Sequence, residues 1–155
     1  ITGYDTAAST VVDLYQNGTL KKSTMKLGAQ TGQLTSNVFQ VTNVPPGVYD
    51  LVVSKSGCLD YTIKNVVVTA DGVDLTSHSN PAIRNITLLA GNMDTNGEIN
   101  LQDLNQFRSN FGKSGSNITN SNADIDGNGI VNLQDLNVFR SSYGKSALSD
   151  SQFEY

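Results

Sequence analysis

Two segments of this chain, residues 92–114 and 124–146, carry nearly the same sequence thirty-two residues apart. They read NMDTNGEINLQDLNQFRSNFGKS and DIDGNGIVNLQDLNVFRSSYGKS, and fifteen of the twenty-three positions are identical. An internal repeat constrains the fold more than composition does, because both copies are expected to adopt the same local structure. Each copy opens with an oxygen-rich loop centred on glycine and continues into a short amphipathic helix.

Both loops match the ligand spacing of an EF-hand, in which oxygen atoms at loop positions 1, 3, 5, 7, 9 and 12 surround calcium and a glycine turns the chain at position 6. Gly97 and Gly129 occupy that sixth position. Calcium is a hard cation that takes roughly six to eight oxygens, so the sequence predicts two Ca²⁺ sites. The predicted ligands are Asn92, Asp94, Asn96, Glu98 (backbone carbonyl) and Asp103 in the first loop, and Asp124, Asp126, Asn128, Ile130 (backbone carbonyl) and Asp135 in the second, with Asn100 and Asn132 at position 9.

The two loops differ in charge at position 1, which is the neutral Asn92 in the first loop and Asp124 in the second. Because calcium affinity follows the number of charged ligands, we expect the first site to be the weaker one. Position 12 is Asp rather than Glu in both loops, so bidentate ligation requires the helix to begin close to the ion. The alternative is a pair of Asx-rich turns that only cap helices. Two such loops in register, each before the same helix, favour calcium.

The residues after each loop have helical periodicity. Leu104, Phe107 and Phe111 recur at intervals of three and four residues, and Leu136, Phe139 and Tyr143 repeat them. This spacing predicts two helices whose apolar stripes face each other and form a small core. Each helix is expected to stop at a glycine followed by a lysine, at Gly112 and Gly144. Residues 114–122, which join the copies, are interpreted as a polar linker.

A second face of each helix is predicted to point outward, roughly a quarter turn from the apolar stripe. An exposed combination of leucine and arginine is typical of an interface anchor, so we name this face the docking strip and predict that it binds a partner protein. The docking strips comprise Leu101, Gln102, Asn105, Arg108 and Ser109 in the first copy and Leu133, Gln134, Asn137, Arg140 and Ser141 in the second. A solvated helix face is the alternative, but the strip recurs in both copies. We hypothesise that either helix can dock, because a two-fold rotation superposes the strips.

The first 88 residues have the signals of short strands. Strands are predicted at residues 11–15, 38–41, 49–53, 61–63, 66–69 and 85–89, separated by turns such as Asn17-Gly18 and the proline pair before Gly47. Short alternating strands between Gly, Pro and Asn turns favour an antiparallel sandwich. The predicted fold class is therefore α+β in two modules, an antiparallel β-sandwich followed by an all-α module with two EF-hand-like loop–helix repeats.

Two resemblances to known families rest on these motifs. The stretch VFQVTNVPPGVYDLVVSKSGCLDYTI resembles the carboxypeptidase regulatory-like, immunoglobulin-like β-sandwich, in which a strand, a "PPG-x-Y" corner and a strand ending in "KxGY" recur. Cys58 stands where that family has an aromatic residue. Such a module is a scaffold without chemistry of its own. Residues 91–146 resemble a dockerin, because paired loops ending in Asp each precede one helix and no helix precedes either loop.

Together the two parts resemble the X-module–dockerin tandem at the C-terminus of cellulosome scaffoldins. This resemblance implies an X-module at residues 1–89, a dockerin at residues 90–155 and a cohesin as the partner, in a secreted or cell-surface complex that degrades cellulose. The Leu-Gln pair at loop positions 10 and 11 is closer to type II or scaffoldin-borne dockerins than to enzyme-borne type I forms. Ile1 begins in mid-pattern without a Met, which predicts a fragment of a longer protein.

Composition and motifs disfavour other classes of function. The net charge of −4 argues against nucleic acid, and no apolar run is long enough to span a membrane. An enzyme is not expected, because His78 is the single histidine, in a polar turn, and neither a nucleophile elbow nor zinc spacing is present. Cys58 is the single cysteine and is interpreted as a small buried residue. A calmodulin-like sensor would need a Met-rich groove, and only two Met are present. A calcium-stabilised carbohydrate-binding or cell-surface adhesion module is the remaining alternative, although the chain has no Trp.

Overall fold

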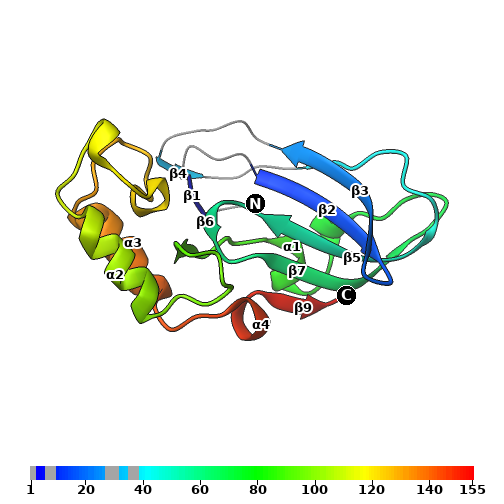
Figure 1. The fold of residues 1–155 in the computed structure, drawn as a ribbon. Helices are drawn as coiled ribbons and strands as arrows, with labels where there is room; N and C mark the ends of the chain where they lie inside the picture. Colours follow the sequence, from blue (N-terminus) through cyan, green and yellow to red (C-terminus); the bar gives the residue numbers. More distant parts are fainter. Residues whose placement is uncertain (1–2, 6–9, 27–31, 35–38) are drawn as a thin grey trace.

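The structure, a computed structural model, describes residues 3–5, 10–26, 32–34 and 39–155. It is a mixed fold dominated by β-structure, with a sheet at one end and helices α2 and α3 at the other (Figure 1). The strands are β1 (Gly3–Asp5), β2 (Thr10–Gln16), β3 (Thr19–Lys26), β4 (Gly32–Leu34), β5 (Gly47–Ser54), β6 (Gly57–Cys58), β7 (Tyr61–Val68), β8 (Ala90–Asn92) and β9 (Gln152–Glu154). The helices are α1 (Pro81–Arg84), α2 (Leu101–Asn110), α3 (Leu133–Ser142) and α4 (Ala147–Asp150), with 3-10 turns η1 (Leu75–Ser77), η2 (Gly115–Asn117) and η3 (Ser121–Ala123).

The main sheet has the strand order β3-β2-β5-β7-β9. The β2–β3 hairpin turns at Asn17-Gly18, where both residues have positive φ values of 51° and 72°, as a tight hairpin turn of this kind requires. The pairs from β3 to β7 are antiparallel, whereas β9 lies parallel to β7. The expectation of a purely antiparallel sheet is therefore wrong at this edge, because the edge strand comes from the distant C-terminus rather than from a hairpin. Two smaller sheets pair β1 with β4 and β6 with β8.

Alternating burial explains why the predicted strands form. In β5, Tyr49, Leu51 and Val53 are buried, and in β2 the same holds for Val12 and Leu14. The strands predicted at residues 11–15 and 49–53 are thereby confirmed. The hydroxyl of Tyr49 donates to the Pro45 carbonyl at 2.9 Å, which anchors the corner that precedes β5.

Four of the predicted strands differ from the structure. The strands expected at 61–63 and 66–69 are one strand, β7, because a bulge opposite β5 accommodates Asn65 with a φ of 59°. Residues 39–41 and 85–89 are loops apart from an isolated bridge at Thr87, and residue 38 lies outside the described residues. Residues 85–89 follow α1, whose N-cap is Asn80 and whose first residue is Pro81. Ile86 and Leu88 still bury their side chains, so their apolar character reflects the core rather than a strand.

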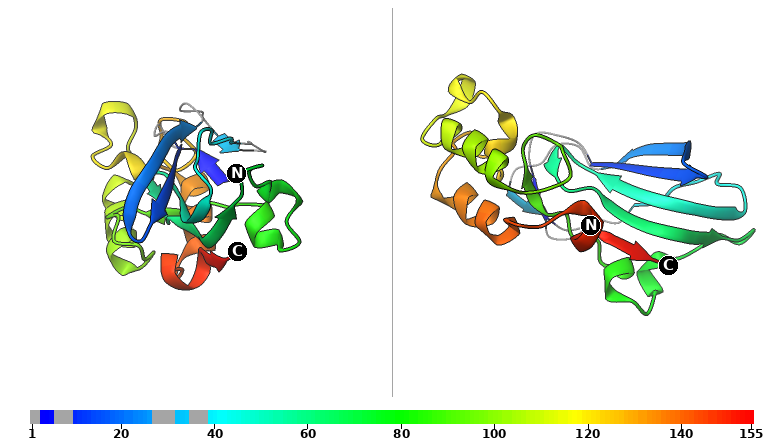
Figure 2. Two further views of the ribbon diagram at one scale, coloured as in Figure 1. Left: turned by 90° about the vertical axis from the view of Figure 1, so that its right-hand side faces the viewer. Right: turned by 60° about the horizontal axis from the view of Figure 1, so that its bottom comes forward.

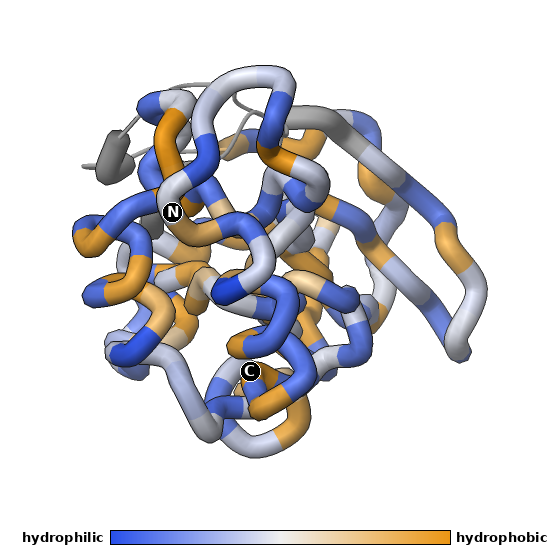
Figure 3. The backbone as a smooth tube through the Cα atoms, turned by 60° about the vertical axis from the view of Figure 1, so that its left-hand side comes forward, coloured by the Kyte–Doolittle hydropathy of each residue, from blue (hydrophilic) through white to orange (hydrophobic). Residues whose placement is uncertain are grey.

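One hydrophobic core joins the sheet to the helices. It combines Leu59 and Ile63 from the sheet region with Phe107 and Phe139 from α2 and α3, and with Ile99 from the first loop. Hydrophobic residues are interspersed with hydrophilic ones along the described backbone, in the sheet and in the helical end alike (Figure 3). In the described residues, no helix has the length and the apolar character that crossing a membrane requires.

The C-terminus returns to the sheet. After α3 the chain runs along the molecule to β9, beside β7 (Figure 1 and Figure 2). The Phe153 ring stacks on Tyr61 with a centroid distance of 5.0 Å, and Tyr155 N–H donates to the Lys64 carbonyl at 3.0 Å. The segment after residue 89 therefore contains strands as well as helices, which corrects the expectation that it is all helical.

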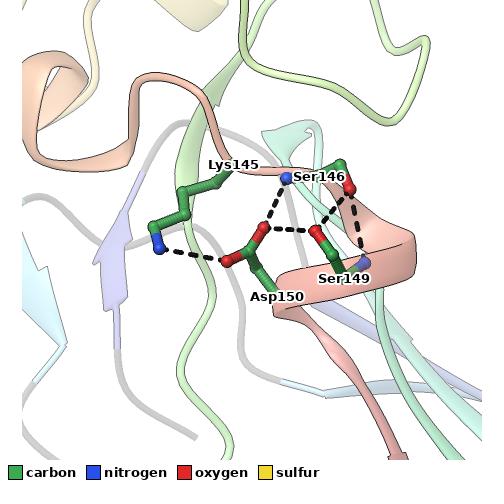
Figure 4. Close-up of polar contacts among 4 residues, drawn as sticks. All are labelled: Lys145, Ser146, Ser149 and Asp150. Carbon is green, nitrogen blue, oxygen red and sulfur yellow. Dashed lines mark hydrogen bonds and ion pairs between the residues drawn. The ribbon is translucent and has the colours of Figure 1, made fainter.

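The short helix α4 is held by its own polar cap. Ser146 Oγ accepts the Ser149 N–H, and the Asp150 carboxylate accepts hydrogen bonds from Ser149 Oγ at 2.6 Å and from Ser146 N–H at 2.9 Å (Figure 4). Lys145 Nζ pairs with the same carboxylate at 3.0 Å. The hydroxyl of Ser149, the Ser146 N–H and Lys145 together lower the pKa of Asp150 to about 2. The capped helix α4 lies between α3 and β9, in the segment that connects the repeats to the sheet.

Candidate functional site

The two predicted loops have closely similar backbones. Gly97 and Gly129, at position 6, have φ values of 88° and 87°, a left-handed conformation that favours glycine. Position 4 is also left-handed in both loops, but it is Thr95 in the first loop, with φ 62°, and Gly127 in the second, with φ 71°. A β-branched residue is strained in this conformation, so the first loop carries a backbone cost that the second avoids.

The carboxylates at position 12 close both loops. Asp135 is fully buried, and its Oδ1 accepts N–H bonds from Ile125 at 2.7 Å and Asp126 at 3.1 Å. Its Oδ2 accepts the Asn132 N–H at 2.9 Å, so one side chain ties the start of the loop to its end. Asp103 makes the equivalent bonds in the first loop, at 2.6 Å from Met93, 3.2 Å from Asp94 and 2.8 Å from Asn100. The helix therefore begins close enough for an aspartate to reach the loop centre.

The asparagines at position 9 have a role that the spacing argument did not identify. Asn100 and Asn132 are the N-caps of α2 and α3, and their side-chain oxygens accept the N–H of Gln102 at 2.8 Å and of Gln134 at 2.6 Å. With aspartate at the third helical position, each forms a capping box. The pattern N-x-x-D before an apolar stripe is the sequence signal for it.

The second loop gathers three carboxylates. One oxygen each from Asp124, Asp126 and Asp135 lies within 4.8 Å of the other two. Burial raises the pKa of both Asp124 and Asp135, and the neighbouring Asp126 charge raises them further, while backbone N–H donors act in the opposite direction. Asp124 Oδ2 accepts the Gly129 N–H at 2.8 Å, but its buried Oδ1 accepts no hydrogen bond from the described residues. Clustered like charges with an unpartnered oxygen fit a hard divalent cation.

Two internal hydrogen bonds of the first loop match those of the second, and the first loop has one ligating carboxylate fewer. Asn96 N–H donates to Asp94 Oδ1 at 3.1 Å and Glu98 N–H to Asn96 Oδ1 at 2.8 Å, which matches Asn128 and Ile130 in the second loop. Asn92 is 4% exposed, and its buried Oδ1 has no hydrogen-bond partner among the described residues. The oxygen donors of the first loop therefore also fit calcium, with the neutral Asn92 amide at position 1.

The two repeats hold each other through reciprocal backbone bonds. Ile99 N–H donates to the Lys145 carbonyl at 2.9 Å, and Gly144 N–H donates back to the Ile99 carbonyl at 2.8 Å. Val131 repeats this with Lys113 at 3.0 Å and with Gly112 at 2.8 Å. Between the helices, Phe107 stacks on Phe139 with a centroid distance of 5.6 Å and an interplanar angle of 21°. Each loop is thus paired with the segment after the other helix, an approximate two-fold arrangement.

The docking strips lie on the surface. The residues of both strips are all exposed, and Leu101 and Leu133 have 58% and 64% of their surface accessible. The apolar stripe differs at its end, because Phe111 and Tyr143 are 45% and 48% exposed rather than part of the core. The helices stop one residue earlier, and the extended ψ values of 130° and 133° at Phe111 and Tyr143 redirect the chain there. The two rings keep an edge contact with the stripe, at centroid distances of 5.9 Å from Phe107 and from Phe139.

The connection between the repeats is not a passive linker. Asn110 is 1% exposed, and its Oδ1 accepts bonds from Thr119 N–H at 2.7 Å, Thr119 Oγ1 at 2.9 Å and Asn120 N–H at 3.2 Å. Asn120 Nδ2 in turn donates to Gln106 Oε1 at 2.6 Å. The polar residues of this segment therefore pin it to α2.

Cys58 is buried at 4% exposure, as expected of a small core residue, and burial raises the pKa of its thiol to about 12. His78 contributes its ring to a contact with Tyr155 at a centroid distance of 5.0 Å, and its Nδ1 accepts the Asn80 N–H at 3.1 Å. Cys58 thus packs in the core, and His78 makes local contacts in its turn and with the C-terminal residue.

No known family model matches the chain, and no curated protein resembles it closely enough to count as a relative. Two solved structures share its fold, both with a TM-score of 0.65: the N-terminal and the C-terminal interface mutants of a type II cohesin–X-dockerin complex from Acetivibrio cellulolyticus. The first is 23% identical over 92% of this chain and 85% of that one, and the second 22% identical over 95% and 96%. The likeness extends over both the sheet and the loop–helix repeats.

Proposed function

We propose that this chain is a calcium-dependent, non-catalytic interaction module that binds a cohesin and so assembles or anchors a cellulosome. In this proposal residues 1–89 are an immunoglobulin-like X-module and residues 90–155 a dockerin, acting outside the cell or at its surface. The observation that carries the proposal is the pair of loop–helix repeats, related by an approximate two-fold, each presenting the same exposed strip. The shared fold with chains from cohesin–X-dockerin complexes supports it.

The calcium part of the proposal rests on the donor set of the loops. Asp124, Asp126 and Asp135 would hold the second ion, and Asp94 and Asp103 with Asn92 the first. Bound calcium would supply the positive charge that offsets the clustered carboxylates. Asp103 and Asp135 already connect the loop to the first turn of the helix, so they transmit the state of the loop to the orientation of the docking strip.

The partner-binding part rests on the chemistry of the docking strip. Leu101 and Leu133 are both exposed, and the exposed Arg108 and Arg140 lie on the same helix faces. Large apolar and arginine side chains dominate binding energy when a partner buries them. A carbohydrate-binding role has less support, because Tyr49 and Tyr61 of the sheet are buried and offer no ring to a glycan.

Calorimetric titration against a panel of cohesins, in calcium and in chelator, tests the proposal. We expect binding to at least one cohesin in calcium and its loss in chelator. The double variants Leu101→Ala with Arg108→Ala, and Leu133→Ala with Arg140→Ala, each remove one strip. If either helix can dock, each double variant keeps binding and only the combination abolishes it; loss in one alone assigns docking to that helix. Failure of every cohesin, or binding unaffected by chelator, contradicts the function.

A further inference from the structure

The first loop begins inside a strand, whereas the second does not. Asn92, at loop position 1, is the last residue of β8 and pairs with Gly57 of β6, next to the pair of Ala90 and Cys58. The Leu59 N–H extends this pairing to the Leu89 carbonyl at 2.9 Å. The start of the first loop and the β6 region are therefore one hydrogen-bonded unit.

The segment that enters the second loop contacts the β6 region through the side chain of Asn122. Position 1 of that loop, Asp124, follows η3, and Asn122 of η3 accepts a hydrogen bond from Ser56 Oγ at 2.9 Å. A Cβ added at Gly57 would lie 3.0 Å from Asn122 Cβ, so the two residues are in close contact. We call residues 56–58 the junction turn, because it touches the entries of both loops.

Asn92 links the first loop to the junction turn through one end of its amide and leaves the other end free to bind a metal. Its Nδ2 donates a long bond of 3.5 Å to the Cys58 carbonyl. Its Oδ1, the atom that a position 1 ligand offers, is buried and accepts no hydrogen bond in the described part of the chain. A cation on an amide oxygen draws electron density from the group and makes its N–H a stronger donor. Ligation at Oδ1 would thus strengthen the bond to Cys58.

We propose that occupancy of the first loop closes the β6–β8 pairing through Asn92, so that calcium controls how firmly the loop–helix repeats are attached to the sheet. This rests on the calcium-binding role proposed above. The neutral amide suits the position, because a carboxylate buried in β8 without a metal would carry an uncompensated charge. The entry of the second loop lies outside a strand and touches the junction turn only through Asn122 of η3, so in this proposal loading of the second loop acts less on the pairing than loading of the first.

Cys58 offers a direct readout. Its thiol is buried in β6 and becomes accessible to a reagent when the β6–β8 pairing opens. A metal that binds only the closed form lowers the open population by the factor 1 + [Ca²⁺]/Kd. Calcium at about one hundred times Kd is therefore expected to slow modification of Cys58 by up to about 100-fold.

The experiment measures the rate of Cys58 modification by an aromatic disulfide reagent in the full chain, in chelator and across a calcium titration. Calorimetry on the same samples gives the number of bound ions. Asp94→Ala removes the position 3 ligand of the first loop without changing a residue of β8. Asp126→Ala is the matched change at position 3 of the second loop. We expect calcium to protect Cys58 in the parent and in Asp126→Ala, and to lose its effect in Asp94→Ala.

Hydrogen exchange separates local closure from general folding. Protection by calcium should concentrate at residues 57–59 and 89–93, and leave the β2–β5 pairing unchanged. Equal protection of every strand, protection that follows Asp126→Ala instead of Asp94→Ala, or two bound ions with no effect on Cys58 would each overturn the coupling while leaving calcium binding intact. Absence of any bound ion would instead reject the calcium function itself.

Discussion

Asn110 illustrates, at the scale of one residue, how this fold uses buried amides. Its side chain lies between α2 and the segment that leads to the second loop, and it satisfies three donors at once. Ser142 occupies the equivalent position in the second repeat and is equally buried, but there the chain departs toward the sheet. The equivalent buried position thus differs between the repeats because the chain segment that follows each helix differs.

The substitution Asn110→Ala is expected to lower the free energy of unfolding by about 2–3 kcal/mol, because it leaves the N–H groups of Thr119 and Asn120 without their acceptor. Chemical denaturation in saturating calcium measures the change. Asn105→Ala, on the exposed face of the same helix, is the matched control and should stay within about 0.5 kcal/mol. Equal effects of both variants would show that the buried bonds contribute nothing specific.

At the scale of the element, the loop and the helix after it form one unit. The position 12 aspartate is at once the closing group of the loop and the third residue of the helix. The carboxylates that crowd the second loop make this unit sensitive to protons. Because burial raises the pKa of Asp124 and Asp135 above the ordinary 3.8, the metal-free native state binds protons more readily than the unfolded chain.

In chelator, we therefore expect the contribution of these two carboxylates to stability to increase as pH falls through their raised pKa values toward 3.8. The contribution of these groups is complete below 3.8 and is lost as pH rises through their raised pKa values. Asp150 titrates near 2, outside this window. Thermal unfolding across pH measures the trend, and Asp124→Asn should flatten it.

With saturating calcium the trend should reverse, since protons then compete with the metal for the same oxygens. A pH trend of the metal-free protein that Asp124→Asn leaves unchanged would contradict the assignment of the raised pKa values to folded-state crowding.

At the scale of the whole molecule, the sheet and the repeats share one core and one edge strand. β9 places Phe153 on Tyr61 and Glu154 beside Asn65, where Asn65 Nδ2 donates to Glu154 Oε2 at 2.7 Å. Gly91 of β8 approaches so closely that an added Cβ would lie 3.1 Å from both Ile99 and Phe139. The chain thus crosses between the two ends of the molecule twice, through β8 and through β9.

Removal of residues 152–155 is expected to lower the free energy of unfolding by roughly 2–4 kcal/mol, because it uncovers the Tyr61 ring and the edge of β7. Denaturation of the truncated chain measures the loss. Leu148→Ala, at a side chain that is 80% exposed, is the control and should change stability little. Unchanged stability after truncation would mean that β9 is a passive tail.

The local geometry of the candidate site could be predicted because its information is local, whereas the metal and partner roles of its residues stay predictions. Loop spacing, glycine positions and the outward face of each helix follow from neighbours within about twelve residues. Sequence reasoning failed where long-range contacts decide. Ile86 and Leu88 are apolar because the core covers them, although they form no strand. Phe111 is half-exposed because α2 ends before it, where the Gly112 N–H donates to the Val131 carbonyl of the other repeat. The N-cap role of Asn100 and Asn132 was available locally and was missed because calcium spacing explained the same residues.

By itself, the sequence determined two equivalent loop–helix units, with the difference at Asn92 and two identical exposed strips, since these depend on periodicity and on side-chain chemistry. Only the tertiary structure decided that each loop pairs with the segment after the other helix, that the first loop starts within β8, and that the C-terminus completes the sheet in parallel. These pairings join residues between about 14 and 90 positions apart. Backbone N–H and C=O groups carry no residue-specific signal, so a sequence pattern cannot choose between partners at such distances.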